Sequence, residues 1–280
     1  MGKISIITDT TCDLSIDVLN NRGIGYIPLN VEINGVNYKD RITITTAEFY
    51  NKIKEKDAFP RTSLISPSDF EEVFQTELNS GNEVIYISVS SKLSGTYNSA
   101  NIAKNNIRSE KINVIDSQTG SSGMAILVLE ANRMVSQGLN STEIIENISN
   151  LISRQKCMIY VENMEMLKRN GRIPPALAAI GNVFKIKPIL TVKDGNVELF
   201  GKARGKKIAF KQISENILSE DIDLTYPIMV AHANNAEYAT DIINLLKENL
   251  KNAKFIISEL GPAMGSHSGE SAIAIWVTIK

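Results

Sequence analysis

The sequence predicts an α/β fold with mostly parallel sheets. Short runs rich in β-branched residues alternate with longer stretches of helical periodicity, which is typical of α/β layers. The stretch 83–89 is almost continuously apolar, as expected for a strand that is buried on both faces in a parallel sheet. The 280 residues allow one large domain or two modest ones, at roughly 100–200 residues per domain.

Local signals place the elements of the first half. Asn34-Gly35 predicts a hairpin turn after an extended stretch. Thr45 followed by Glu48 forms a capping-box pattern, and Ser66 followed by Pro67 indicates the start of another helix. We expect strands at 4–8, 26–33, 83–89 and 112–115, and helices at 15–21, 46–56, 66–81, 96–107, 122–137 and 141–155.

The second half continues the alternation. Asp194-Gly195 predicts a hairpin between strands at 189–192 and 197–200. The other expected strands are at 157–161, 227–232, 254–258 and 272–279, with helices at 175–184 and 236–250. The amphipathic helix at 141–155 would link the halves, so we expect a domain boundary near residue 155.

Composition excludes several classes of partner. With 30 basic and 31 acidic residues, the chain lacks the basic excess that binds phosphates, so we expect no nucleic-acid partner. No apolar run approaches the roughly 18 residues of a membrane-spanning helix, and the first residues do not resemble a signal peptide, so we expect a cytoplasmic protein. Cys12 and Cys157 are far apart and form no CxxC motif, which argues against a disulfide framework or a zinc site. We expect no metal.

The common catalytic motifs are absent, including GxxxxGK[ST], GxGxxG, HExxH and GxSxG. Three hydroxyl- and glycine-rich segments remain, at 60–67, 88–97 and 261–269, and each follows a strand or precedes a helix, where α/β sheets bind ligands. Each also has a structural explanation. Ser66 could simply cap its helix, 88–97 could be an ordinary turn between strand and helix, and 261–269 could be a surface loop.

Other polar residues have stronger structural than functional explanations. His232 ends a predicted strand without a partner at ligand spacing, and we interpret it as structural. Asp9, Asp13 and Asp116 lie near strand ends, where turn or cap roles are more common than metal binding. The basic segment 168–172 is either a solvated turn or a patch for an acidic partner.

Taken together, these segments resemble the DegV family of bacterial fatty-acid-binding proteins, which includes the carrier subunits of fatty acid kinase. The resemblance spans the chain, and SSKLSGTYNSA at 90–100 is its strongest motif. The other matching segments are TDTTCDL at 8–14, Thr62-Ser63 with Ser66-Pro67, Asp116-Ser117, Leu167 through Ile173, and Gly261 through Gly265 with His267 and Gly269.

The resemblance implies two α/β domains, 1–155 and 156–280, with a long-chain fatty acid such as palmitate between them. Its carboxylate would be bound by Thr62 and Ser94, with Ser63 beside them and His267 from the second domain. We expect His267 to help orient and neutralise the carboxylate, and no buried arginine to be needed. Gly95, Thr96 and Gly265 would support this site.

The same resemblance implies a carrier rather than an enzyme, without a cofactor other than the bound lipid. It would take the acid from a membrane by transient contact and present it to an ATP-dependent fatty acid kinase subunit, which makes the acyl phosphate. Arg172 and Arg204 would face that partner. The chain departs from the family pattern at 62–67, at 169–171 and at Glu270-Ser271, and these departures concern tail selectivity and partner docking.

Two other functions remain open. Ser94 and His267 could form a Ser-His hydrolase, although no orienting carboxylate is evident. The segments could also belong to a regulatory module that binds another protein. The helix at 122–137 is a candidate wall for the lipid tunnel, although ordinary core packing explains most of it equally well.

Overall fold

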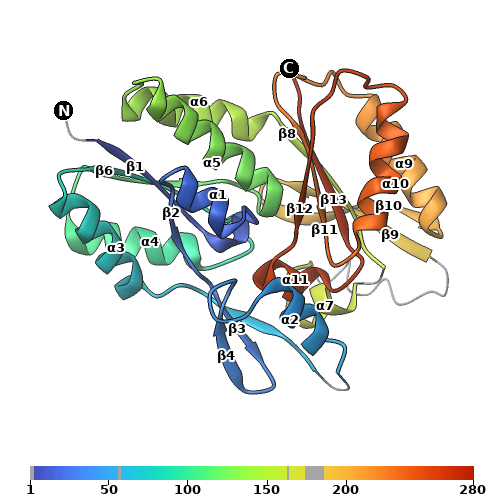
Figure 1. Ribbon diagram of the computed structural model, residues 1–280, viewed down its shortest axis with the longest axis horizontal. Helices are drawn as coiled ribbons and strands as arrows, with labels where there is room; N and C mark the ends of the chain where they lie inside the picture. The colour runs from blue at the N-terminus through green and yellow to red at the C-terminus, as the bar shows by residue number, and fades with distance from the viewer. Residues whose placement is uncertain (1–2, 56–57, 163, 174–185) are drawn as a thin grey trace.

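A computed structural model of the chain describes residues 3–55, 58–162, 164–173 and 186–280. It contains two large sheets with helices packed on their faces, and a small third sheet below them (Figure 1). The predicted α/β class is confirmed. The helix expected at 175–184 lies outside the described residues.

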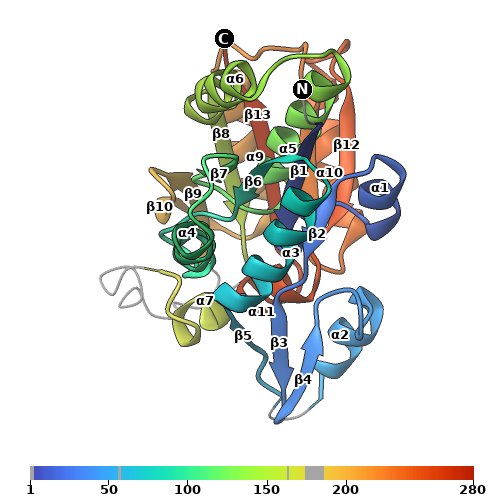
Figure 2. The same ribbon diagram turned by 90° about the vertical axis from the view of Figure 1, so that its left-hand side faces the viewer.

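The first sheet is wholly parallel, with strand order β2-β1-β6-β7. Its strands are β1 (Ile4–Asp9), β2 (Gly25–Ile27), β6 (Glu83–Ser88) and β7 (Ile112–Asp116). The central strand β6 is buried along nearly its whole length, as its apolar run predicts. One face is covered by α3 (Pro67–Asn79) and α4 (Thr96–Ile107), and the other by α5 (Ser121–Ser136), on which α6 (Ser141–Ser153) packs (Figures 1 and 2).

Between β1 and β6 the chain also forms an η1 turn (Thr10–Cys12), a short helix α1 (Ile16–Asn21) and a separate three-stranded antiparallel sheet. That sheet contains β3 (Asn30–Ile33), β4 (Val36–Lys39) and β5 (Arg61–Ser63), and α2 (Thr46–Lys52) lies beside it. The Asn34-Gly35 hairpin is confirmed, and both residues have positive φ. Both predicted capping patterns are also present, at Thr45 for α2 and at Ser66 for α3.

The second sheet has six strands in the order β10-β9-β8-β13-β11-β12, and here the expectation of mostly parallel pairing is wrong. Only β11 and β12 are parallel. The Asp194-Gly195 hairpin makes its two strands antiparallel, because a two-residue turn reverses the chain. The strands are β8 (Gln155–Tyr160), β9 (Ile186–Lys193), β10 (Asn196–Arg204), β11 (Ile228–His232), β12 (Phe255–Glu259) and β13 (Ile273–Thr278).

Two helices cover one face of the second sheet, α9 (Lys206–Leu218) and α10 (Ala236–Lys247). The sequence analysis did not identify α9. Phe210, Ile213 and Ile217 recur at helical spacing and are buried, but the residue before the helix, Gly205, offers no side-chain cap as a start signal.

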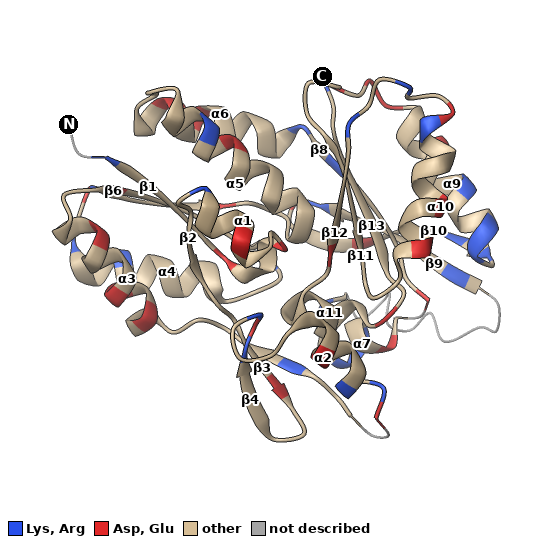
Figure 3. Ribbon diagram, viewed as in Figure 1, with Lys and Arg blue, Asp and Glu red and all other residues tan. Residues whose placement is uncertain are grey.

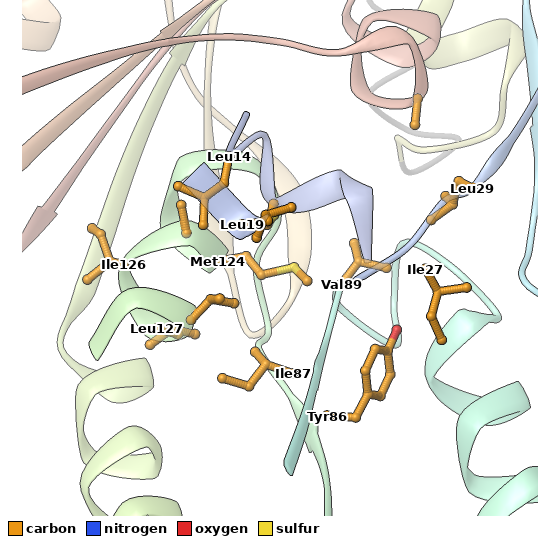
Figure 4. Close-up of a cluster of buried hydrophobic side chains, with 14 of the residues drawn as sticks. Leu14, Leu19, Ile27, Leu29, Tyr86, Ile87, Val89, Met124, Ile126 and Leu127 are labelled. Carbon is orange, nitrogen blue, oxygen red and sulfur yellow. The ribbon is translucent and has the colours of Figure 1, made fainter. Parts of the chain in front are cut away.

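The helix α5 joins the two halves. It contacts β1 and β6 of the first sheet and β11 and β13 of the second. A Cβ on Gly123 would lie 2.4 Å from Nε1 of Trp276, so only glycine allows α5 to approach β13 this closely. Figure 4 shows part of the resulting buried cluster, with Met124, Ile126 and Leu127 of α5 near Leu14, Leu19 and Ile87. Most of α5 is therefore core, as its alternative explanation proposed.

One buried cluster includes residues of both sheets, whereas a second lies entirely in the 156–280 half. The predicted boundary falls at the connection between α6 and β8. The division of the chain into domains 1–155 and 156–280 stays a prediction.

The segment 261–269, considered as a surface loop, instead contains a largely buried helix, α11 (Pro262–Ser268). It contacts α2, β3, β5 and the short helix α7 (Glu165–Arg169), where the two halves meet. Within the described ranges, no helix is long and apolar enough to cross a membrane.

Candidate functional site

Two neighbouring cavities lie around α11. The first is lined by Thr11, Leu29, Thr62, Val89, Leu93, Ser94, Leu167, Arg172, Val197, Ala263, Met264 and His267. The second has five of these residues in common with the first, Leu93, Leu167, Val197, Met264 and His267, and is otherwise lined mainly by apolar side chains of β8, β9 and β13, including Ile159, Leu190 and Trp276. The polar groups are therefore concentrated in the first cavity, and the second is largely apolar.

Thr62 and His267 meet in the first cavity, although 205 positions separate them in the chain. The Thr62 Oγ1 atom lies 2.8 Å from His267 Nε2, which is hydrogen-bond distance. Thr62 is on β5 and His267 on α11, and the packing of these two elements brings them together. This pairing joins the first and third of the segments that the sequence singled out.

The second segment places Ser94 in the same cavity. The Ser94 hydroxyl lies 2.8 Å from Thr96 Oγ1 and accepts a hydrogen bond from the Thr96 amide. Thr96 itself is buried at the first position of α4 and lines neither cavity, so it orients Ser94. Close packing explains why position 95 is glycine, since a Cβ there would lie 2.9 Å from Leu64 Cδ2.

The Ser94 loop is held against the other half of the chain. The Ser90 hydroxyl donates a hydrogen bond of 2.8 Å to the Gly195 carbonyl in the β9–β10 turn. A Cβ on Gly195 would lie 2.5 Å from that Ser90 oxygen. The turn therefore needs glycine for its close approach as well as for its positive φ.

Two predicted site residues lie elsewhere. Ser63 follows Thr62 on β5, is exposed and lines neither cavity, because successive side chains of a strand point to opposite faces. Gly265 also lines neither cavity. A Cβ on Gly265 would lie 2.8 Å from Tyr50 Oη and from Phe49 Cε1, so Gly265 permits α11 to pack tightly on α2.

Burial and, to a smaller extent, the nearby Arg172 guanidinium together lower the pKa of His267 to about 3, which favours the neutral imidazole at physiological pH. The Nδ1 atom is buried without a hydrogen-bond partner in the described structure. An uncharged ring donates or accepts a hydrogen bond but does not balance a negative charge, and the role of His267 toward a bound carboxylate stays a prediction.

Arg172, expected at a surface that faces a protein partner, lines the first cavity. Its contact with a partner and the expectation that no arginine is needed both stay predictions. Its Nε atom donates a hydrogen bond of 3.2 Å to the Leu93 carbonyl, and its Nη1 atom donates one to the Asn170 carbonyl. Partial burial lowers its pKa, and no described carboxylate forms an ion pair with it. Arg204, in contrast, is exposed at the end of β10.

The basic segment 168–172 is not a solvated turn throughout. The side-chain amide of Asn170 donates a hydrogen bond of 2.9 Å to the Ser266 carbonyl of α11. The Arg169 guanidinium lies 3.9 Å from the Phe59 ring centroid. Sequence reasoning missed Thr11, Leu93, Val197 and Met264 as lining residues. Leu93 and Met264 lie inside two of the segments it selected, which was the available signal.

The acidic residues near strand ends have structural partners. Asp9 accepts hydrogen bonds from the amides of Thr11 and Val89 and from the Tyr86 hydroxyl. Asp116 accepts from the amides of Ser91 and Gln118. The described part of the chain contains no group of three or more His, Cys, Asp or Glu that could hold a metal. His232 accepts a hydrogen bond from the Asn235 amide, in agreement with a structural role.

The geometry does not support a Ser-His hydrolase. The His267 Nε2 atom is bonded to Thr62 rather than Ser94, and the Ser94 hydroxyl is bonded to Thr96. The other ring nitrogen has no orienting carboxylate among the described residues. A triad needs both contacts.

The fold and the cavities define an α/β protein with a largely apolar ligand cavity and a few polar groups at one side of it. The DegV family model matches residues 3–280, and the chain therefore belongs to the DegV family.

Three similar proteins illustrate the relationship. A DegV domain-containing protein of Caldanaerobacter subterraneus is 35% identical, and the alignment covers all of both chains. The structure of a fatty-acid-binding DegV family protein of Thermus thermophilus superposes with a TM-score of 0.91 at 30% identity, over 99% of this chain and 100% of the other. A stearic acid-binding protein of Eubacterium ventriosum gives a TM-score of 0.89 at 26% identity, over 100% and 99% of the two chains.

Proposed function

We propose that this protein is a non-catalytic carrier that binds a long-chain fatty acid such as palmitate. One observation carries the proposal: Thr62, Ser94, His267 and Arg172 gather in the first cavity, and a largely apolar cavity adjoins it. A fatty acid has the same division into a polar head and an apolar tail. Each buried CH₂ contributes about 0.8 kcal/mol of transfer free energy, so the tail would supply most of the affinity.

The polar residues suit a carboxylate. If Thr62 donates its hydroxyl proton to His267 Nε2, the neutral ring carries its own proton on the unpartnered Nδ1; if Nε2–H donates to Thr62, the hydroxyl proton is free. In both arrangements the pair keeps one donor. Arg172 adds a positive charge at the same cavity, and charge-assisted hydrogen bonds are roughly twice as strong as neutral ones. Relatives of known structure that bind fatty acids support the choice of a fatty acid as the ligand.

Lipid analysis tests the proposal directly. Protein purified from bacteria should release long-chain fatty acid on denaturation, detected by mass spectrometry, and delipidated protein should bind added palmitate. The double variant Thr62→Ala/Ser94→Ala should bind at least about tenfold more weakly, since two hydrogen bonds to a charged group are lost. Ser63→Ala is the matched control, because Ser63 is exposed and lines neither cavity. If the purified protein releases no fatty acid and the delipidated protein binds no added palmitate, the proposed function is refuted.

We further propose that the bound acid is presented, in the cytoplasm, to an ATP-dependent kinase that forms the acyl phosphate, after transient contact with a membrane. Exposed Lys202, Arg204 and Lys207, at the end of β10 and the start of α9, form a basic surface that suits an acidic partner (Figure 3). In a reaction with kinase and ATP, hydroxylamine should trap the acyl phosphate as a hydroxamate. Arg204→Ala should lower its yield without changing palmitate affinity, and an unchanged yield would exclude Arg204 from docking.

A further inference from the structure

A buried polar cluster lies just outside the ligand cavities, at the N-terminal end of α11. Asp13, directly after η1, accepts a hydrogen bond from the Gly261 amide with its Oδ1 atom at 2.8 Å. The Tyr50 hydroxyl of α2 donates a hydrogen bond of 3.0 Å to the Leu260 carbonyl. The two residues that lead into α11 are thus both bonded to side chains more than 200 positions earlier in the chain.

The packing at this junction is tight. A Cβ on Gly261 would lie 3.0 Å from Arg41 Nε and 3.3 Å from Asp13 Oδ1, so the backbone itself touches both side chains. Arg41 in turn donates to the carbonyls of Thr10 and Leu14, on either side of Asp13. The loop that carries Asp13 is therefore held by Arg41 as well as by its contacts with α11, and the loop can position the helix.

The cluster is energetically unfavourable as a mere core element. Asp13 and Asp40 are buried carboxyl groups close to the guanidinium of Arg41. Asp40 Oδ1 lies 3.8 Å from Arg41 Nε, Asp13 also interacts with the Ser121 hydroxyl, and Asp40 interacts with the Thr10 hydroxyl and the Ala263 amide of α11. Burial raises the pKa of Asp13 to about 7 and also raises that of Asp40, so removing these carboxyl groups from water is costly and packing alone does not explain their presence.

The helix that Asp13 contacts carries the cavity residues Met264 and His267. No side chain within α11 or at Gly261 caps its N-terminus, and a helix of 7 residues has little stability of its own. Its position therefore depends on contacts from outside.

We propose that Asp13 is a positioning residue for the ligand site: it caps α11 from the other half of the chain and thereby holds Met264 and His267 in the cavity. Asp13 itself lines neither cavity, so it acts through the helix and not on the ligand. The inference rests on the proposed function only for the identity of the ligand.

Nuclear magnetic resonance of the imidazole nitrogens tests the positioning step without any ligand. The chain has only 2 histidines, so His232 is an internal control for His267. In Asp13→Ala, the ¹⁵N resonances of His267 should shift while those of His232 stay in place. Asp13→Asn keeps an acceptor for the Gly261 amide and should restore the wild-type His267 resonances.

Binding provides the second readout. Palmitate affinity should fall about tenfold in Asp13→Ala and recover in Asp13→Asn, since a buried hydrogen bond to the Gly261 amide is lost and then replaced. Because Asp13 has a positive φ of 54°, Asp13→Gly removes the acceptor without straining the backbone and should give the same readouts as Asp13→Ala. Unchanged His267 resonances in a folded Ala or Gly variant would overturn the proposal. Shifted resonances in a protein that binds no fatty acid would keep the positioning role and refute the proposed function.

Discussion

At the scale of single residues, the surroundings of His267 favour an uncharged imidazole beside Thr62. A charged imidazole would have to be desolvated next to the Arg172 guanidinium, and both effects lower its pKa. The positive charge at the cavity therefore belongs to Arg172, and His267 contributes hydrogen bonding. This division of roles could not be read from the sequence, because burial and proximity set the pKa.

The depressed pKa of His267 makes a prediction about stability and pH. The unfolded state takes up a proton near pH 6.5, whereas the folded state does so only near pH 3, so the folded state loses stability as pH falls through this range. Between pH 7.5 and 5, the free energy of unfolding should decrease by about 2 kcal/mol more in wild type than in His267→Gln. Urea titrations at the two pH values measure this difference. Equal decreases in both proteins would show that His267 titrates normally.

At the scale of elements, local signals predicted those that begin with a side-chain cap or end in a tight turn. The capping boxes at Thr45 and Ser66 and the turns at Asn34-Gly35 and Asp194-Gly195 all have the predicted structure. These motifs depend on hydrogen bonds and φ angles within a few residues. The structural explanation for Ser66 is thus confirmed.

Two of the helices that the sequence did not predict, α11 and α9, lack such signals. In α11, glycine and serine disfavour a helix, and no side chain at its start provides a cap. Contacts from α2, β5 and Asp13 stabilise it instead. The helix α9 likewise follows a glycine without a capping side chain. Tertiary packing overrides weak local preference in both.

The contact between α11 and α2 yields a prediction for this element. In Gly265→Ala the new methyl group would lie 2.8 Å from Phe49 and Tyr50, so α11 must move. We expect the free energy of unfolding to fall by about 1–3 kcal/mol, as for other overpacked sites, together with weaker palmitate binding. The control is Gly201→Ala, because nothing lies within 4 Å of a Cβ at Gly201. Denaturant unfolding and a binding titration measure both, and an unaffected Gly265→Ala protein would contradict this role of the packing.

At the scale of the whole molecule, the helix α5 joins the two sheets beside the second cavity. Gly123 lets α5 contact Trp276 of β13 directly. The same Trp276 lines the second cavity, and its indole donates 3.2 Å to Thr119 Oγ1. The joint between the halves is therefore also a wall of the cavity.

That arrangement makes Trp276 a reporter of ligand entry. It is the only tryptophan in the chain, so intrinsic fluorescence reports this site alone. Palmitate should change the emission maximum or intensity in a saturable way, because the tail replaces the present surroundings of the indole. A short acid such as acetate should leave the emission unchanged, since it does not reach the second cavity. Constant emission in protein shown by mass spectrometry to hold palmitate would place the tail elsewhere.

The sequence by itself determined the α/β class, most strands and helices, and the segments that hold Thr62, Ser94 and His267. Those features follow from periodicity, capping and turn chemistry, which act over a few residues. Only the tertiary structure decided that Thr62 meets His267, that Asp13 caps α11, that Arg172 faces the cavity while Ser63 faces solvent, and that the second sheet is mainly antiparallel. The physical reason is that these outcomes depend on which faces of distant elements pack together, and that choice is made by the burial of the whole core.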